Sequence, residues 1–335
     1  MILMHYFNRT YFEKETDQWP MISLIFKIEI PLIVFNILHT WLFHWINLKS
    51  VQFHNNWASI MSILYIQHIV ADCAWIGQRV LLIQDSFTDP FESDLFIRLS
   101  YIRAFCLFLG LSILPCLIIE RIYATIHISD YESKLRAHIF YTLLCLLTII
   151  GSITSYTYHK YESSLAIFTF ITISSSLGIM GNIILLNLNL RYYDERSEAC
   201  LKTRYQITEN IKVCRLVNGI VFSMGGFNGL MCITIITDKF NLSTYTSSLS
   251  MFAFDISAII YSTVFPYVCM HYCKNWKATF LKLIAKFTRQ RRSVQPYTTP
   301  ESINKAGLTL KNTKGEVMSE YTTDVYFQQL KLSWA

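Results

Sequence analysis

Charged residues are scarce in this sequence. Only 16% of its 335 residues are Asp, Glu, Lys or Arg, whereas 53% are hydrophobic and 15% are aromatic. A soluble globular domain carries about 25% charged residues, so this composition excludes an ordinary soluble protein. It favours a protein that lies within a membrane.

Signals typical of secreted or metal-binding proteins are also lacking. The first twenty residues include four charged side chains between Glu13 and Asp17, and they contain no apolar core with a cleavage site, so we expect no cleaved signal peptide. Nine cysteines are present, but there is no CxxC motif and no Cys/His cluster at zinc-ligand spacing. Because none falls in a segment expected on the outer side, we predict no structural disulfide. We also expect no metal site and no cofactor.

Long apolar segments dominate what is present. A helix that crosses about 30 Å of hydrocarbon needs about 20 residues, whereas a barrel strand needs only about ten. We therefore predict an all-α, polytopic membrane protein with a seven-transmembrane helix bundle in residues 21–272. The seven predicted spans are Met21–Leu48, Trp57–Ile83, Leu95–Arg121, Ala137–Tyr158, Ser164–Leu190, Val213–Ile236 and Tyr245–Tyr272.

Basic residues indicate which side of the membrane is cytoplasmic. With the N-terminus outside, seventeen Lys and Arg residues fall on the inner side and four on the outer side. Because cytoplasmic loops carry the Lys/Arg excess, we predict that residues 1–20 are extracellular. The two N-x-Ser/Thr sequons, at Asn8 and Asn241, both fall on this outer side, where glycans can be attached.

The third predicted span ends in an adjacent acid and base, Glu120 and Arg121. At the cytoplasmic boundary such charges are tolerated and can be held by neighbouring helices. Arg121 can hold an inactive packing and be released towards a partner when the helices separate. The alternative is an ordinary interfacial anchor. The charged inner connection 191–212 should extend the helices on both sides of it and offer a docking surface.

A second arginine, Arg103, lies on the same predicted span. It precedes Arg121 by 18 residues, or about five helical turns, so both side chains should face the bundle interior. Arg103 then either pairs with an interior carboxylate or receives an acidic group of a ligand. Pairing with Asp72, Asp255 or Glu29 is favoured, because unpaired buried charges are costly.

The outer halves of the spans are rich in aromatic residues, and a pocket lined by rings suits small, largely apolar ligands. The alternative is that these rings serve packing or anchor the helices at the interface. His68 lies one turn from Asp72, which favours a hydrogen-bonded pair. The ligand-pocket candidates are Asp72, Trp75, Arg103, Phe252 and Asp255.

Backbone features mark two helices and the tail. Gly225 and Gly226 in span six, and Pro266 in span seven, are sites where a helix can bend; close helix packing at the glycines is the alternative. Residues 273–292 show the pattern of a basic amphipathic helix on the inner leaflet, with a merely solubilising tail as the alternative. The polar residues 293–335 predict a disordered cytoplasmic tail.

Four short motifs carry a family resemblance: "FHNNW" (53–57), "ERIYAT" with "SDYE" (120–132), "RYQITENI" (204–211) and "FPY" (265–267). Together they resemble the nematode serpentine chemoreceptors of the Sra superfamily, most closely class epsilon, the Sre family. The resemblance implies a G-protein-coupled receptor of sensory neurons, located in the plasma membrane and the cilium. Arg121 would then take the part of the arginine in the Asp-Arg-Tyr motif of rhodopsin-like receptors.

We predict that the protein is a receptor and no enzyme, because no nucleophile/base constellation is evident. Its expected partners are a heterotrimeric G protein, an environmental or pheromone-like small molecule and the lipid bilayer, with no nucleic acid; whether it forms dimers is left open. A ligand-gated channel would need a polar stripe along a span, and a transporter would need two matching interrupted helices. Neither is evident. The candidates for switching and G-protein coupling are Glu120, Arg121, Arg204, Glu209 and Asn210.

Overall fold

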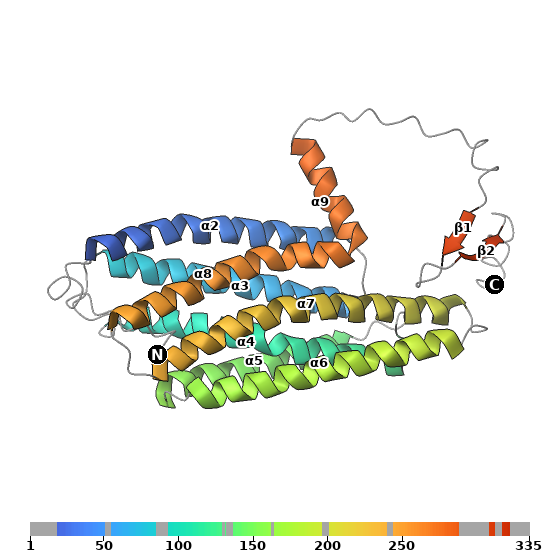
Figure 1. The fold of residues 1–335 in the computed structure, drawn as a ribbon, viewed down its shortest axis with the longest axis horizontal. Coiled ribbons are helices and arrows are strands. Elements are labelled where there is room, and N and C mark those ends of the chain that lie inside the picture. Colours follow the sequence, from blue (N-terminus) through green and yellow to red (C-terminus); the bar gives the residue numbers. More distant parts are fainter. Residues whose placement is uncertain are drawn as a thin grey trace.

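The structure, a computed structural model, describes residues 19–50, 55–84, 93–128, 131, 137–161, 164–195, 201–239, 244–287, 308–311 and 317–321. Within these residues, seven long helices run side by side along the long axis of the molecule (Figure 1). They are α2 (Trp19–Lys49), α3 (Asn55–Ile83), α4 (Asp94–Ile126), α5 (Ala137–Tyr161), α6 (Ser164–Glu195), α7 (Leu201–Lys239) and α8 (Thr244–Tyr272).

These helices confirm the predicted all-α bundle. Each one covers one of the predicted spans, and six of them, α2 to α6 and α8, are long and apolar enough to cross a membrane. The remaining long helix in the described part of the chain, α7, begins at Leu201, about three turns before the predicted span. Helix α6 likewise continues to Glu195, so the charged inner connection does extend both helices.

Helix α4 lies at the centre of the bundle. Its middle turns are buried on every face, as the consecutive residues Leu111, Ser112, Ile113 and Leu114 illustrate, whereas its ends expose side chains such as Ile126. Its start is defined by Ser93, whose side chain accepts a hydrogen bond from the backbone N–H of Phe96 as an N-cap. A helix that is buried all round belongs in a core.

The peripheral helices have the opposite character. Helices α2, α5 and α6 expose large apolar side chains such as Leu38, Ile153 and Leu177. Apolar surface of this extent is unusual for a soluble monomer and matches a bundle surrounded by hydrocarbon. We use "inner end" for the side formed by the C-termini of α2, α4, α6 and α8 with the N-termini of α3, α5 and α7.

The predicted flexing residues lie inside continuous helices. Gly225 and Gly226 are part of α7, and Pro266 is part of α8, which continues for more than a turn beyond it. Helix α8 also contributes Phe265 to the core next to Tyr65, with ring centroids 6.0 Å apart. The glycosylation candidates Asn8 and Asn241 lie outside the described residues.

A shorter helix, α9 (Lys274–Phe287), follows α8 and leaves the bundle at a steep angle (Figure 1). Trp276 at its start is buried, and Phe280 stacks on Phe43 of α2 with ring centroids 5.5 Å apart. Lys277 and Lys282 are exposed. The helix therefore has one side held by the bundle and a basic side that is free of it.

The described part of the tail contains two short strands. Leu308–Lys311 (β1) pairs antiparallel with Val317–Tyr321 (β2), with Leu308 opposite Tyr321. The expectation of disorder throughout 293–335 therefore does not hold for these residues. The cause is local, since Leu308 and Leu310 alternate with polar residues at strand spacing.

Candidate functional site

Four buried charged side chains from four helices form what we call the outer network. Arg79 of α3 donates from Nε to Glu29 of α2 and from Nη2 to Asp255 of α8, each at 2.6 Å. Arg103 of α4 donates from Nη2 to the other carboxylate oxygen of Asp255. None of the four is more than 6% exposed. Because opposite charges alternate along the network, each buried ion has a partner.

Aromatic rings cover the guanidinium groups of the outer network. The Arg79 guanidinium carbon lies 4.4 Å from the ring centroid of Phe26 and 5.8 Å from that of Phe252. The guanidinium carbon of Arg103 lies 4.5 Å from the centroid of a Trp75 ring. Such cation–π contacts hold the arginines in place in addition to their ion pairs.

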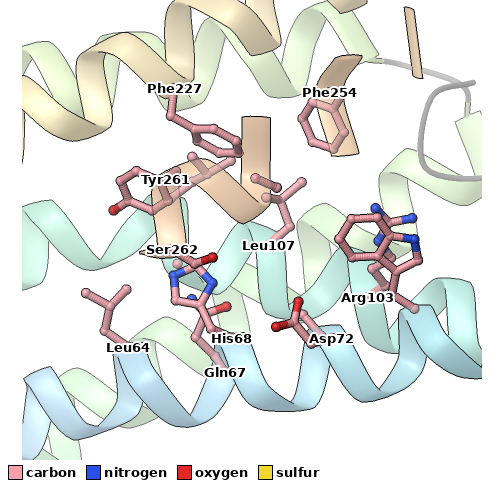
Figure 2. Close-up of a pocket in the computed structure, with 15 residues that line it drawn as sticks. Leu64, Gln67, His68, Asp72, Arg103, Leu107, Phe227, Phe254, Tyr261 and Ser262 are labelled. Atoms are coloured by element: carbon pink, nitrogen blue, oxygen red, sulfur yellow. The ribbon is translucent and has the colours of Figure 1, made fainter. Parts of the chain in front are cut away.

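A cavity of about 70 Å³ lies beside Arg103, between α3, α4, α7 and α8. Figure 2 shows Phe227, Phe254 and Tyr261 on one side of it and the α3 residues on the other, with Asp72 between His68 and Arg103. The cavity is lined by Leu64, Gln67, His68, Ala71, Asp72, Trp75, Arg103, Leu107, Gly110, Leu111, Phe227, Phe254, Ala258, Tyr261 and Ser262.

Some polar groups of the cavity have hydrogen-bond partners and others have none among the described residues. The Asp72 carboxylate accepts a 2.7 Å hydrogen bond from Asn36 of α2, and Asn36 in turn accepts one from Ser262 at 2.8 Å. In contrast, Nε2 of His68 and the Tyr261 hydroxyl are buried without a hydrogen-bond partner among the described residues. Buried polar atoms normally have partners, so these atoms are candidates for contact with a ligand.

The predicted pair of His68 and Asp72 is wrong. Asp72 reaches across to Asn36 on α2, while the His68 ring packs against Tyr261 of α8 with centroids 5.9 Å apart. Spacing by one turn places both residues on one face of α3. The partner of each side chain is nevertheless set by the helix that packs against that face.

The pocket candidates separate into two groups. Asp72, Trp75 and Arg103 line the cavity, whereas Asp255 lies behind Arg103 as its ion-pair partner. Phe252 does not line the cavity and belongs to an apolar cluster with Phe26. The position two residues further along α8, Phe254, lines it instead.

Arg79 was not among the residues predicted for the site. A signal was present, because His68, Asp72, Trp75 and Arg79 are spaced by four, three and four residues. That spacing defines one face of a helix. The face of α3 that lines the cavity thus continues into the outer network.

At the inner end, Arg121 is buried in what we call the inner lock. Its guanidinium binds the Glu120 carboxylate with two hydrogen bonds, from Nε at 2.5 Å and from Nη2 at 2.6 Å. Tyr131, beyond the end of α4, donates its hydroxyl to the same carboxylate. All three side chains are at most 1% exposed. Neighbouring residues of a helix do not normally face each other, so the long side chains must curl together to meet.

A chain of polar side chains connects the inner lock to α6 and α7. Arg121 donates from Nη1 to Asn210 of α7 at 3.2 Å, and Asn210 donates to Asn189 of α6 at 3.4 Å. Asn189 donates to Thr125 of α4 at 3.1 Å. These distances are at the long end of the hydrogen-bond range, so each is a weaker contact than the bidentate pair.

The other two coupling candidates lie on the same helix as Asn210. Glu209 is buried beside it at 7% exposure. Arg204 lies further towards the inner end, with its guanidinium carbon 5.4 Å from the ring of Tyr193 on α6. The charge of Glu209 acts on Arg121, so the structure brings Glu120, Arg121, Glu209 and Asn210 together and leaves Arg204 outside the inner lock.

Residues from distant motifs meet at the inner lock. In the "FHNNW" motif, a ring centroid of Trp57 is 5.3 Å from the guanidinium carbon of Arg121. Asn56, the residue before Trp57, forms a hydrogen bond with Tyr131. Burial and the charge of Glu120 raise the pKa of the Tyr131 phenol. The phenol therefore stays protonated at neutral pH and keeps donating to Glu120.

Within the described ranges, no group of three His, Cys, Asp or Glu side chains is arranged to hold a metal ion. What the molecule does contain is a multi-pass helix bundle with an interior cavity and with buried arginines at both ends. This combination is typical of a multi-pass membrane protein, and receptors of the seven-helix class have it.

Comparison with known proteins identifies the family. Residues 2–335 match the family described as Sre G protein-coupled chemoreceptor, so the chain belongs to the Sre family. It is 26% identical to serpentine receptor class epsilon-12 of Caenorhabditis elegans over 100% of this chain and 99% of the relative. It is 28% identical to serpentine receptor class epsilon-13 of the same species over 98% and 95% of the two chains. The predicted resemblance is confirmed, and the family consists of chemoreceptors, a kind of protein other than enzymes.

Proposed function

We propose that this receptor binds a small, largely apolar molecule in the cavity and activates a heterotrimeric G protein at its inner end. The observation that carries the proposal is the burial of Arg121 in the inner lock. Residues from three of the four motifs that carry the family resemblance form this lock. In this proposal the protein lies in the plasma membrane with its N-terminus outside. Location in a sensory cilium is proposed from the family alone.

The inner lock has the properties of a closed switch. Arg121 binds its own helix through two short hydrogen bonds, whereas α7 offers it one hydrogen bond of 3.2 Å to Asn210 and the nearby charge of Glu209. Moving the inner half of α7 away breaks that contact and uncovers the guanidinium. An uncovered guanidinium offers five donors in a fixed fork, which suits the backbone carbonyl groups of a partner.

The cavity is placed where a ligand can influence that movement. Phe227 of α7 stacks on Tyr261 of α8 with ring centroids 5.0 Å apart, and both line the cavity. A molecule that inserts beside these rings changes how α7 packs on α8. Because α7 is one continuous helix from Leu201 to Lys239, a shift at Phe227 is transmitted to Asn210.

The inner surface provides a basic platform for a partner and for anionic lipid. Lys212 and Arg215 of α7 are exposed, as are Lys274 and Lys277 of α9. Exposed bases of this kind each contribute about 1 kcal/mol of attraction to an anionic leaflet. This charge supports the proposed cytoplasmic location of the inner end.

G-protein coupling is tested by GDP–GTP exchange in membranes that carry the receptor, with one purified heterotrimer from each Gα class. Glu120→Gln weakens the bidentate pair, so we expect it to raise ligand-independent exchange. Arg121→Ala, alone or added to Glu120→Gln, should abolish exchange at equal surface level. Arg98→Ala, at an exposed position of the same helix, is the matched control. Exchange that is unchanged in every variant, or absent with all heterotrimers, would contradict the proposal.

The proposed orientation has its own test. An epitope tag at the N-terminus should be accessible on intact cells and a tag at the C-terminus should not. Asn8→Gln and Asn241→Gln should each remove a glycan that endoglycosidase treatment releases from the unmodified receptor. Accessibility of both tags, or of neither, would contradict the orientation.

A further inference from the structure

The buried charges around the cavity do not balance. The outer network contains two carboxylates, Glu29 and Asp255, and two arginines, Arg79 and Arg103, so it is neutral in itself. Asp72 is a further buried carboxylate at 7% exposure. Among the described residues, no other buried Lys or Arg lies at this end of the bundle. With every carboxylate ionised, the group has three acids against two arginines, and the carboxylate in excess is Asp72.

Asp72 lies at the cavity wall and forms no ion pair among the described residues, although the charge of Arg103 acts on it. Its one hydrogen bond within the described ranges comes from the neutral amide of Asn36. Arg103 also lines the cavity, but it is already bound to Asp255. A buried carboxylate whose direct contact is a neutral amide is unfavourable in a low-dielectric interior, so a cation that enters beside it gains a strong interaction.

The other walls of the cavity suit an organic cation. The rings of Trp75, Phe227, Phe254 and Tyr261 line it, and aromatic faces attract cations. Nε2 of His68, one turn from Asp72, has no hydrogen-bond partner among the described residues. In the neutral imidazole with its proton on Nδ1, this nitrogen accepts a hydrogen bond, as an N–H group of an ammonium requires.

From these observations we propose that the cavity binds a small protonated amine, with its ammonium group on Asp72 and its apolar body against the aromatic wall. The inference rests on the proposed role of the cavity as the ligand site and names the chemical class of the ligand. An acidic ligand is disfavoured, because it would have to displace Asp255 from Arg103 and would add a second negative charge near Asp72. The cavity is small, which limits the amine to a few carbon atoms or one ring.

The test measures binding to the purified receptor in nanodiscs, without a G protein. The thermal unfolding midpoint is followed with three amines, benzylamine, cyclohexylamine and isopentylamine, and with the alcohols of matching shape. We expect at least one amine to raise the midpoint in a saturable way, while its alcohol has no such effect. Sodium benzoate, an acid of similar shape, should have no effect.

Asp72→Asn is the decisive variant, because it keeps an oxygen that can accept from Asn36 and removes only the charge. The apparent affinity for the amine should fall by about thirtyfold or more. This factor is the lower end of the loss in affinity expected when one partner of a buried charge pair is removed. Asp94→Asn, which removes an exposed carboxylate at the start of α4, should leave the affinity unchanged. If Asp72→Asn does not fold, Ala258→Phe fills the cavity without changing any charge and should abolish amine binding.

Several outcomes would overturn the inference. These are equal stabilisation by amine and alcohol, stabilisation by benzoate, stabilisation by none of the amines, and amine binding that persists in Asp72→Asn or in Ala258→Phe. The readout is independent of nucleotide exchange. If the receptor fails to activate a G protein, the amine site is therefore unaffected. If no amine binds, the exchange assay still decides whether the receptor couples to a G protein.

Discussion

The outer network and the inner lock both bury arginine against carboxylate, but they connect the chain differently. In the outer network the ion pairs join residues 50, 176 and 152 positions apart, and they link four helices. In the inner lock the ion pair joins adjacent residues of one helix. The only hydrogen bond from Arg121 to another helix in the described part of the chain is the 3.2 Å contact with Asn210.

This difference shows that a buried arginine can either tie helices together or stay with its own helix. Breaking the outer network separates charges that belong to different helices, which leaves each of them unpaired in the interior. Opening the inner lock moves α7 away, and Glu120 stays beside Arg121 on the same helix until a partner binds the guanidinium. The outer end is therefore suited to act as a fixed point, and the inner end is suited to open.

The largest effect should come from breaking the outer network. Arg79→Met removes the arginine that bridges Glu29 and Asp255, and it leaves one carboxylate without a partner. We expect a loss of about 3–5 kcal/mol in the free energy of unfolding, as for other broken buried ion pairs. Thermal unfolding of the purified receptor and its surface level measure the effect. Arg98→Met, at an exposed site, is the control; equal midpoints for the two variants would show that the network does not stabilise the bundle.

A smaller effect, on activity rather than on folding, should follow from Tyr131→Phe. The substitution removes the hydroxyl that donates to Glu120, and hydrogen bonds to charged groups contribute about 1.5–3 kcal/mol. We expect ligand-independent nucleotide exchange to rise while the unfolding midpoint changes little. Tyr141→Phe, at an exposed site on α5, should change neither. Nucleotide exchange at the level of the unmodified receptor would show that the Tyr131 hydroxyl does not help to keep the receptor inactive.

The smallest effect should come from Asn210→Ala, which removes the contact between Arg121 and α7. A neutral amide contributes about 0.5–1.5 kcal/mol to such a contact, so ligand-independent exchange should rise by at most about tenfold. Asn187→Ala, which removes an exposed amide from α6 outside the inner lock, serves as the control in the exchange assay. Reduced exchange in Asn210→Ala would mean that this contact holds the active state instead of the inactive one.

Much of the fold follows from local sequence patterns. The bounds of the helices agree closely with the apolar segments, because the length of hydrocarbon to be crossed sets the length of each apolar run. Arg103 and Arg121 both face the interior of α4, as their spacing of about five turns predicts. The main departure is α7, whose polar first turns extend well beyond its apolar segment.

The choice of partners could not be predicted in this way. Three carboxylates were candidates for Arg103, and the packing of α8 on α2 and α7, which brings Asp255 within reach of α4, selects Asp255. Phe252 and Phe254 are equally aromatic, yet two residues rotate a helix by about 200°, so only the second lines the cavity.

Hydrophobic length and helical period are properties of one segment, so the sequence specifies the number of helices, their extent and the face that each one buries. Which acid meets which base depends on how the helices rotate and slide against one another. Many side chains from several segments set that rotation together, and only the folded bundle therefore places Asp255 between two arginines and leaves Asp72 without one.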